Sequence, residues 1–139
     1  MSSNAQVRRR AVQAARGESP FDLLLIDAQI VDMATGEIRP ADVGIVGEMI
    51  ASVHPRGSRE DAHEVRSLAG GYLSPGLMDT HVHLESSHLP PERYAEIVLT
   101  QGTTAVFWDP HELANVLGVA GVRYAVDASR HLPLQVMVA

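Results

Sequence analysis

PGLMDTHVH, residues 75–83, is the stretch that decides how the second half of this 139-residue chain folds. A Pro-Gly turn leads into a short strand-forming run that ends in two histidines, His81 and His83. Alternate residues of a strand share a face and lie about 6.6 Å apart along it, so both imidazoles can approach one metal ion. Each would offer one neutral nitrogen and keep its other N–H for a neighbouring acceptor. Asp79 lies on the same face, where it could orient a histidine or approach the ion itself.

The histidine pair by itself is weak evidence for a metal site. Seven histidines in this chain would give about 0.3 such pairs by chance. Two histidines at a strand end can also be simply solvated or hydrogen-bonded. Their position favours the metal hypothesis, because α/β barrels carry their catalytic groups at the carboxyl ends of the strands.

Residues 76–139 are predicted to alternate strands with helices. The predicted strands are LMDTHVHLE (77–85), TTAVFW (103–108) and LPLQVMVA (132–139). The first helix begins at Pro90-Pro91 and ends at Gly102, and the second covers 111–130 with a break near Gly118 or Gly121. This order favours a parallel sheet with right-handed crossovers. The sequence predicts the first three strands of an incomplete (β/α)8, TIM-like barrel, since a complete barrel takes about 250 residues.

The first part of the chain, residues 1–20, is predicted to be a helical segment. Residues 4–16 are rich in helix formers, and Gly17 is a natural end. Val7, Val12 and Ala15 form only a weak apolar stripe, which is typical of a frayed or loosely docked terminal helix. The alternative is that the basic side, with Arg8–Arg10, covers a site contributed by other parts of a larger protein.

Residues 21–75 are predicted to form a small β-sandwich module. Short β-rich runs are separated by turn residues, among them Thr35-Gly36, Pro40 and Gly47-Glu48. The runs on either side of Gly47-Glu48 predict a hairpin. The fold class is therefore α/β, with a β-module followed by the start of a barrel.

Composition excludes several classes of function. The net charge of −6 and the scarcity of aromatic residues argue against a nucleic-acid partner. The chain has no cysteine, which excludes disulfides and thiolate zinc sites. No apolar run reaches the ~18 residues of a membrane span, and no apolar stretch follows the basic cluster as a secretory signal would require. We therefore expect a cytoplasmic protein without a membrane partner.

Three motifs together resemble one enzyme family. PGLMDTHVH is similar to the signature that opens the barrel in the amidohydrolase superfamily, where the two histidines bind a divalent metal. HVHLESSHL (81–89) and QGTTAVFWDPHELANVLG (101–118) resemble the adenine deaminases of that superfamily. AARG (14–17) and the β-module before the barrel also fit, so the resemblance runs from about Ala14 to Ala139.

The resemblance implies hydrolytic deamination of adenine to hypoxanthine and ammonia. It also implies a binuclear metal site, with manganese or iron favoured and zinc an alternative, and a homo-oligomer in the full-length form. In that family the bridging carboxylate, further histidines and a late aspartate come from later barrel strands. We therefore expect the general acid and base to lie outside this chain, and the chain alone to be inactive.

Five carboxylate and imidazole residues besides His81 and His83 are candidates for supporting roles. They are Asp79, Glu85, Asp109, His111 and Glu112, and the resemblance implies substrate contact, support of the metal ligands or an accessory metal site. Asp109 is also a good N-cap, so its alternative role is to cap the helix that follows. Glu85 continues the alternation of His81 and His83, and its alternative is a solvated loop carboxylate.

Other polar residues receive weaker interpretations or none. His88 is a minor candidate, and His54, His63 and His131 are expected at the surface or in loops. Ser86 and Ser87 lack the G-x-S-x-G elbow of a serine hydrolase.

Two alternative functions stay open. The first is another amidohydrolase, such as a cyclic-amide hydrolase or a deacetylase, which would share the paired histidines. The second is a truncated, non-catalytic module.

Overall fold

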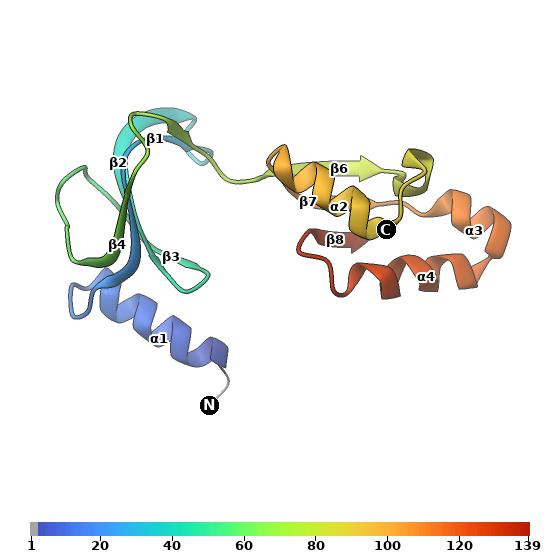
Figure 1. Cartoon of the computed structure of the whole chain (residues 1–139), viewed down its shortest axis with the longest axis horizontal. Helices are drawn as coiled ribbons and strands as arrows, with labels where there is room; N and C mark the ends of the chain where they lie inside the picture. The colour runs from blue at the N-terminus through green and yellow to red at the C-terminus, as the bar shows by residue number, and fades with distance from the viewer. Residues whose placement is uncertain (1–2) are drawn as a thin grey trace. The chain divides into compact units, whose positions relative to one another are not determined.

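The computed structural model describes residues 3–139 and shows a mixed α/β chain in two compact units, the first ending at Pro75 and the second running from Gly76 to Ala139 (Figure 1). Met1 and Ser2, which belong to the predicted segment 1–20, lie outside the described residues. Among the helices of residues 3–139, none has the length and apolar character needed to cross a membrane.

The first unit is built on a five-stranded sheet. Its strands are β1 (Phe21–Asp32), β2 (Glu37–Val46), β3 (Met49–His54), β4 (Ala62–Ser67) and β5 (Tyr72–Leu73). β1, β2 and β3 form an antiparallel meander, which confirms the predicted hairpin around Gly47-Glu48, while β4 and β5 both pair with β1 in parallel.

Pro40, predicted as a turn residue, lies inside β2 opposite Gln29. The backbone N–H of Gln29 donates to Gly71 on the opposite side, at 2.9 Å. Gln29 and Pro40 are therefore a non-hydrogen-bonded pair, and β3 pairs with β2 only from Asp42 onward. The missing N–H of Pro40 thus removes no ladder bond, which is where a strand tolerates proline.

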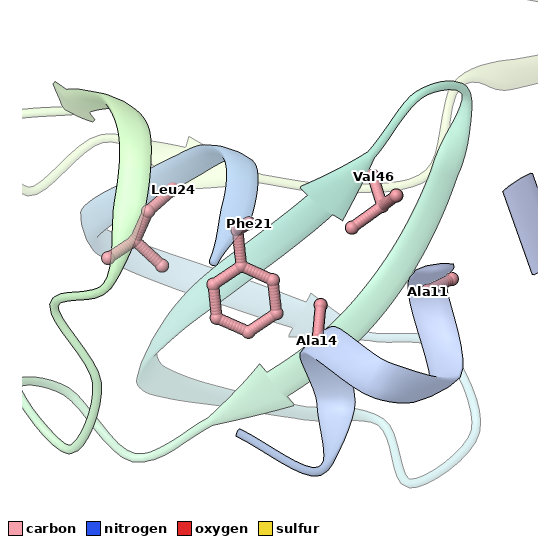
Figure 2. Close-up of a cluster of buried hydrophobic side chains, with 5 residues drawn as sticks. All are labelled: Ala11, Ala14, Phe21, Leu24 and Val46. Atoms are coloured by element: carbon pink, nitrogen blue, oxygen red, sulfur yellow. The ribbon is translucent and has the colours of Figure 1, made fainter. Parts of the chain in front are cut away.

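Helix α1 (Ser3–Ala15) packs on this sheet through its small residues. Ala11 and Ala14 are buried and join one apolar cluster with Phe21, Leu24 and Val46 (Figure 2). The predicted stripe is wrong at Val12, which is 55% exposed, and at Ala15. The helix is also anchored at two points, because Arg10 pairs with Asp22 and Arg59 Nη1 donates to the Ala14 carbonyl at 3.0 Å. The interpretation of a loosely docked helix is therefore wrong.

The first unit also buries His54, although the sequence predicts it at the surface or in a loop. His54 ends β3, is 8% exposed, and stacks on Phe21 with ring centroids 5.8 Å apart. Alternation along a short strand next to a polar loop does not show which residue turns inward.

The second unit confirms the predicted strand–helix alternation. Its parallel sheet has the order β6 (Leu77–Val82), β7 (Thr103–Trp108), β8 (Gln135–Val138). The helical elements are η1 (Leu84–Ser87, one 3-10 turn), α2 (Pro91–Thr100), α3 (His111–Leu117) and α4 (Val119–Ser129). The break between α3 and α4 falls at Gly118, as expected, where φ is +60°.

Apolar side chains from all these elements fix the sheet of the second unit. Trp108 and Leu84 are each 1% exposed and pack with Ala125 of α4, while Val106 packs with Ala95 of α2. The carboxyl ends of β6 and β7 are thereby held beside each other.

Candidate metal centre

The predicted metal-binding histidines lie where β6 ends, beside the end of β7. His81 is in β6, and His83 is the first residue past it, as the N-cap of η1. Asp109 directly follows β7, and its backbone N–H donates to the Val82 carbonyl at 3.0 Å. Parallel strands place their carboxyl ends at one edge of the sheet, so residues far apart in sequence meet there.

Three potential ligand atoms converge at this edge. Within residues 3–139, His81, His83 and Asp109 form a group whose ligand atoms all lie within 4.8 Å of one another. The two Nε2 atoms are 3.3 Å apart, and the imidazole planes are inclined by 73°. Bonds of about 2.0–2.1 Å from both nitrogens to one ion would subtend roughly 105–110°, which is close to tetrahedral. The residues present therefore fit a divalent metal ion.

The ring of His83 is oriented by the backbone. Its Nδ1 lies 2.9 Å from the Asp109 carbonyl oxygen. A carbonyl only accepts, so Nδ1 carries the proton and donates. In the neutral imidazole, Nε2 then has its lone pair free on the side that faces His81. An N–H held by an outer acceptor is typical of metal-binding histidines.

Asp109 does not cap the helix that follows it, so that alternative is wrong. The N-cap of α3 is Pro110, and the structure of residues 3–139 shows no side-chain cap hydrogen bond at this helix end. The Asp109 carboxylate instead lies 3.2 Å from His111 Nδ1 and 3.6 Å from His81 Nε2. Partial desolvation alone would raise the pKa of Asp109, but the hydrogen bond from His111 and the nearby imidazoles lower it on balance.

His111 and Glu112 lie beside this group. The His111 ring stands edge-on to His83, with centroids 4.4 Å apart. The Glu112 carboxylate accepts from the Ser86 hydroxyl, at 3.0 and 2.9 Å to its two oxygens. Both residues are exposed, so Glu112 connects η1 to α3 at the rim of the site.

Glu85 does not continue the strand alternation of the histidines, because β6 ends at Val82 and Glu85 lies in η1. Its Oε2 accepts from the indole Nε1 of Trp108 at 2.6 Å. Asp79 lies earlier in β6, where its Oδ1 accepts from the backbone N–H of His81 at 3.1 Å. Asp79 is thus next to the histidine but outside the three-residue group.

Two contributors to this edge are not identified by reasoning from the sequence. Trp108 belongs to no recognised metal-site pattern, although a tryptophan at a strand's carboxyl end has a donor that needs a partner. The carbonyl of Asp109 is backbone, so no residue type could reveal it.

The amidohydrolase family model matches residues 72–139. The relatives described next match the part of the chain before residue 72 as well.

Over its whole length the chain is similar to adenine deaminases. It is 97% identical over all 139 residues to the adenine deaminase of Klebsiella pneumoniae (strain 342) and covers 23% of that protein. It is 73% identical over 132 residues, 95% of the chain, to the adenine deaminase of Serratia proteamaculans (strain 568) and covers 22% of it. The chain therefore spans less than a quarter of these relatives.

Solved structures support the fold. A crystal structure of D-aminoacylase is 32% identical, with a TM-score of 0.55 over 65% of this chain and 19% of that one. L-hydantoinase from Arthrobacter aurescens is 23% identical, with a TM-score of 0.55 over 65% of this chain and 21% of that one, and this likeness concerns the fold alone.

Proposed function

We propose that this chain is part of an enzyme that hydrolyses adenine to hypoxanthine and ammonia. The observation that carries the proposal is the convergence of His81, His83 and Asp109 on one point at the ends of two parallel strands. The proposed substrate, adenine, is inferred from the 97% identity to an adenine deaminase.

A divalent metal is the group that these residues would hold. The donors are imidazole nitrogens and a carboxylate, and the chain has no thiolate, which suits manganese, iron or zinc. D-aminoacylase, which is 32% identical to this chain over the matched part, has a binuclear metal centre, and we infer a binuclear site here, with manganese or iron favoured. When bound, the metal would lower the pKa of water so that hydroxide is available near neutral pH.

The reaction adds water at C6 of the purine and breaks the exocyclic C6–N bond, so that one water enters and one ammonia leaves. His81 and His83 would bind the metal, and the Asp109 carbonyl keeps His83 in the tautomer that can do so. Asp109, His111 and Glu112 lie close enough to support these ligands or contact the purine. We assign the general acid and base to residues outside this chain.

The same proposal includes the architecture of the larger protein. Residues 1–20 would be an N-terminal helical segment, residues 21–75 a small β-sandwich module, and residues 76–139 the start of a (β/α)8 barrel. In support, one face of the first sheet is an apolar groove of about 440 Å³, lined by residues that include Ile45, Ile50 and Val53. Ile50 is 70% exposed there, as expected of a sheet that packs against another.

We further propose that the 139 residues alone do not deaminate adenine. A catalytic metal ion needs a dry, shaped cavity, whereas the side chain of His81 is 65% exposed. We propose a cytoplasmic, homo-oligomeric full-length enzyme.

The test is an ammonia-release assay on adenine with Mn²⁺. It compares the 139-residue chain with a chimera in which this chain replaces the matching segment of the Klebsiella adenine deaminase, and with the same chimera carrying His83→Asn. Activity in the chimera, and its loss with His83→Asn, would support the proposal. A metal-loaded, folded chimera inactive on adenine but active on an N-acyl-D-amino acid or a hydantoin would replace it with another amidohydrolase activity. Ammonia release by the homogeneous chain alone would refute the inactivity of this piece.

A further inference from the structure

The 3-10 turn that follows the histidine pair, η1, is not stable by itself. η1 has four residues, and its backbone bonds run from Ser86 N to the His83 carbonyl at 3.0 Å and from His88 N to the Glu85 carbonyl at 3.1 Å. One 3-10 turn is marginal without tertiary contacts. His83 is the N-cap of this turn, so the direction of its imidazole depends on how η1 is held.

Two side-chain hydrogen bonds join η1 to the segment after β7. Ser86 donates to Glu112, and this bond lies in solvent. Glu85 accepts from Trp108, and this bond is largely enclosed, since Trp108 is 1% exposed. Trp108 immediately precedes Asp109, whose carbonyl holds His83 Nδ1. The Glu85–Trp108 bond therefore joins η1, which begins at His83, to Trp108. Trp108 is the neighbour in sequence of Asp109, whose carbonyl orients the His83 ring.

The two carboxylate oxygens of Glu85 differ, because Oε2 is bonded to the indole and Oε1 is not bonded within the described part of the chain. Its Oε1 is buried and has no hydrogen-bond partner among residues 3–139, and a buried unpaired acceptor costs about 1–3 kcal/mol. An apolar side chain would avoid that cost only by leaving the buried indole N–H of Trp108 without an acceptor. The carboxylate is better explained by what its other oxygen does, which is to fix Trp108 and η1 relative to each other.

We propose that Glu85 and Trp108 are positioning residues: their hydrogen bond holds η1 so that the His83 imidazole stays on the Asp109 carbonyl with Nε2 directed at the metal position. This inference rests on the proposed function only for the identity of what His83 binds. The orientation of His83 itself is a property of the chain without metal.

The first measurement is ¹⁵N NMR of the imidazoles in the metal-free 139-residue chain, with the His83 signals assigned by His83→Gln. The wild-type chain is expected to show the Nδ1–H tautomer with a slowly exchanging Hδ1. Trp108→Phe, which keeps an aromatic ring and loses the donor, and Glu85→Ala are expected to give a mixed tautomer and fast exchange. Glu85→Gln keeps an acceptor for the indole and is expected to retain the wild-type signals. Glu96→Gln, on the exposed face of α2, is the matched control.

The second measurement is the Mn²⁺ affinity of the chimera and its variants, followed by the EPR signal of free Mn²⁺. Loss of an outer hydrogen-bond partner typically weakens metal binding about 10–100-fold, and this loss is expected for Glu85→Ala and Trp108→Phe but not for Glu85→Gln. His83 signals that stay at their wild-type values in folded Trp108→Phe would overturn the positioning role. A chimera that binds no Mn²⁺ would instead refute the proposed metal site, while the imidazole spectra still decide the role of Glu85.

Discussion

Gly44 in β2 lies against the ring of Phe21, and replacing it with alanine gives a defined steric test of the first unit. An added Cβ would overlap Cε1 of that ring and lie 2.5 Å from Cζ and 2.6 Å from Cδ1. The ring has little freedom to move, because it is fully buried and stacks on His54, and the guanidinium carbon of Arg59 lies 4.6 Å from the ring centroid. The substitution must therefore displace part of the apolar cluster on which α1 packs.

The expected magnitude combines two opposed effects. Overpacking a core costs about 1–3 kcal/mol, and three overlapped ring atoms place Gly44→Ala in the upper half of that range. Replacing a strand glycine by alanine recovers about 0.5–1 kcal/mol of conformational entropy. The net loss of stability is about 1–2 kcal/mol, which lowers the Tm of a unit of this size by roughly 5–15 °C.

The assay is thermal unfolding followed by far-UV circular dichroism, in the wild-type and Phe21→Leu backgrounds. Leucine removes the ring atoms that meet the new Cβ, so Gly44→Ala should cost less than half as much there. Trp108, the single tryptophan, lies in the second unit, and its emission provides an internal reference. An unchanged or raised Tm for Gly44→Ala, or an equal cost in both backgrounds, would refute the steric reasoning.

Three further predictions concern pH and backbone strain. Burial lowers the pKa of His54 despite the Asp42 carboxylate, so the unfolded chain binds this proton more readily. The free energy of unfolding is then highest above about pH 6.5 and falls as the pH drops toward the folded-state pKa of His54. In His54→Phe, the free energy of urea unfolding should therefore change less between about pH 7.5 and 5.5. An unchanged pH dependence would contradict this. The backbone N–H of Gly47, then Arg10, lowers the pKa of Asp22, so the stability that Asp22 contributes is present above about pH 3.8 and is lost as the pH falls through the folded value. Asp22→Asn should reduce this acid dependence when the urea titrations are extended below about pH 4, and an unchanged acid dependence would contradict it. His88 has φ +57°, a conformation that costs a non-glycine residue about 1 kcal/mol, so His88→Gly should leave the Tm of the second unit unchanged or raise it, whereas a drop of several degrees would reveal a side-chain role.

The parts of the fold that the sequence predicted are those determined by local pattern. Gly102 and Gly118 ended helices because both adopt positive φ. The run from Thr103 to Trp108 became a strand because β-branched and aromatic residues favour that conformation. The helix face that docks on the first sheet was mispredicted, because its close approach depends on Ala11 and Ala14 rather than on the larger Val12.

The candidate site shows the same division between local and long-range information. His81 and His83 could be found because their spacing puts both on one side of a strand end. Asp109 was a candidate only through its resemblance to a family motif, since by composition an aspartate before proline predicts a helix cap. Only the pairing of β6 with β7 brings its carboxylate and its carbonyl to the histidines.

The arrangement around His83 supports the proposed metal site against the alternative of a chance cluster. A solvated histidine pair needs no fixed tautomer, yet the Asp109 carbonyl fixes that of His83, and this carbonyl is placed by the bond from Asp109 N to Val82. Without a metal, the 3.3 Å between the two Nε2 atoms fits a hydrogen bond from the Nε2–H tautomer of His81 to the free Nε2 of His83. The proposed metal ion would take the place of this proton, because the tautomer of His83 that accepts the hydrogen bond is also the one that can bind a metal.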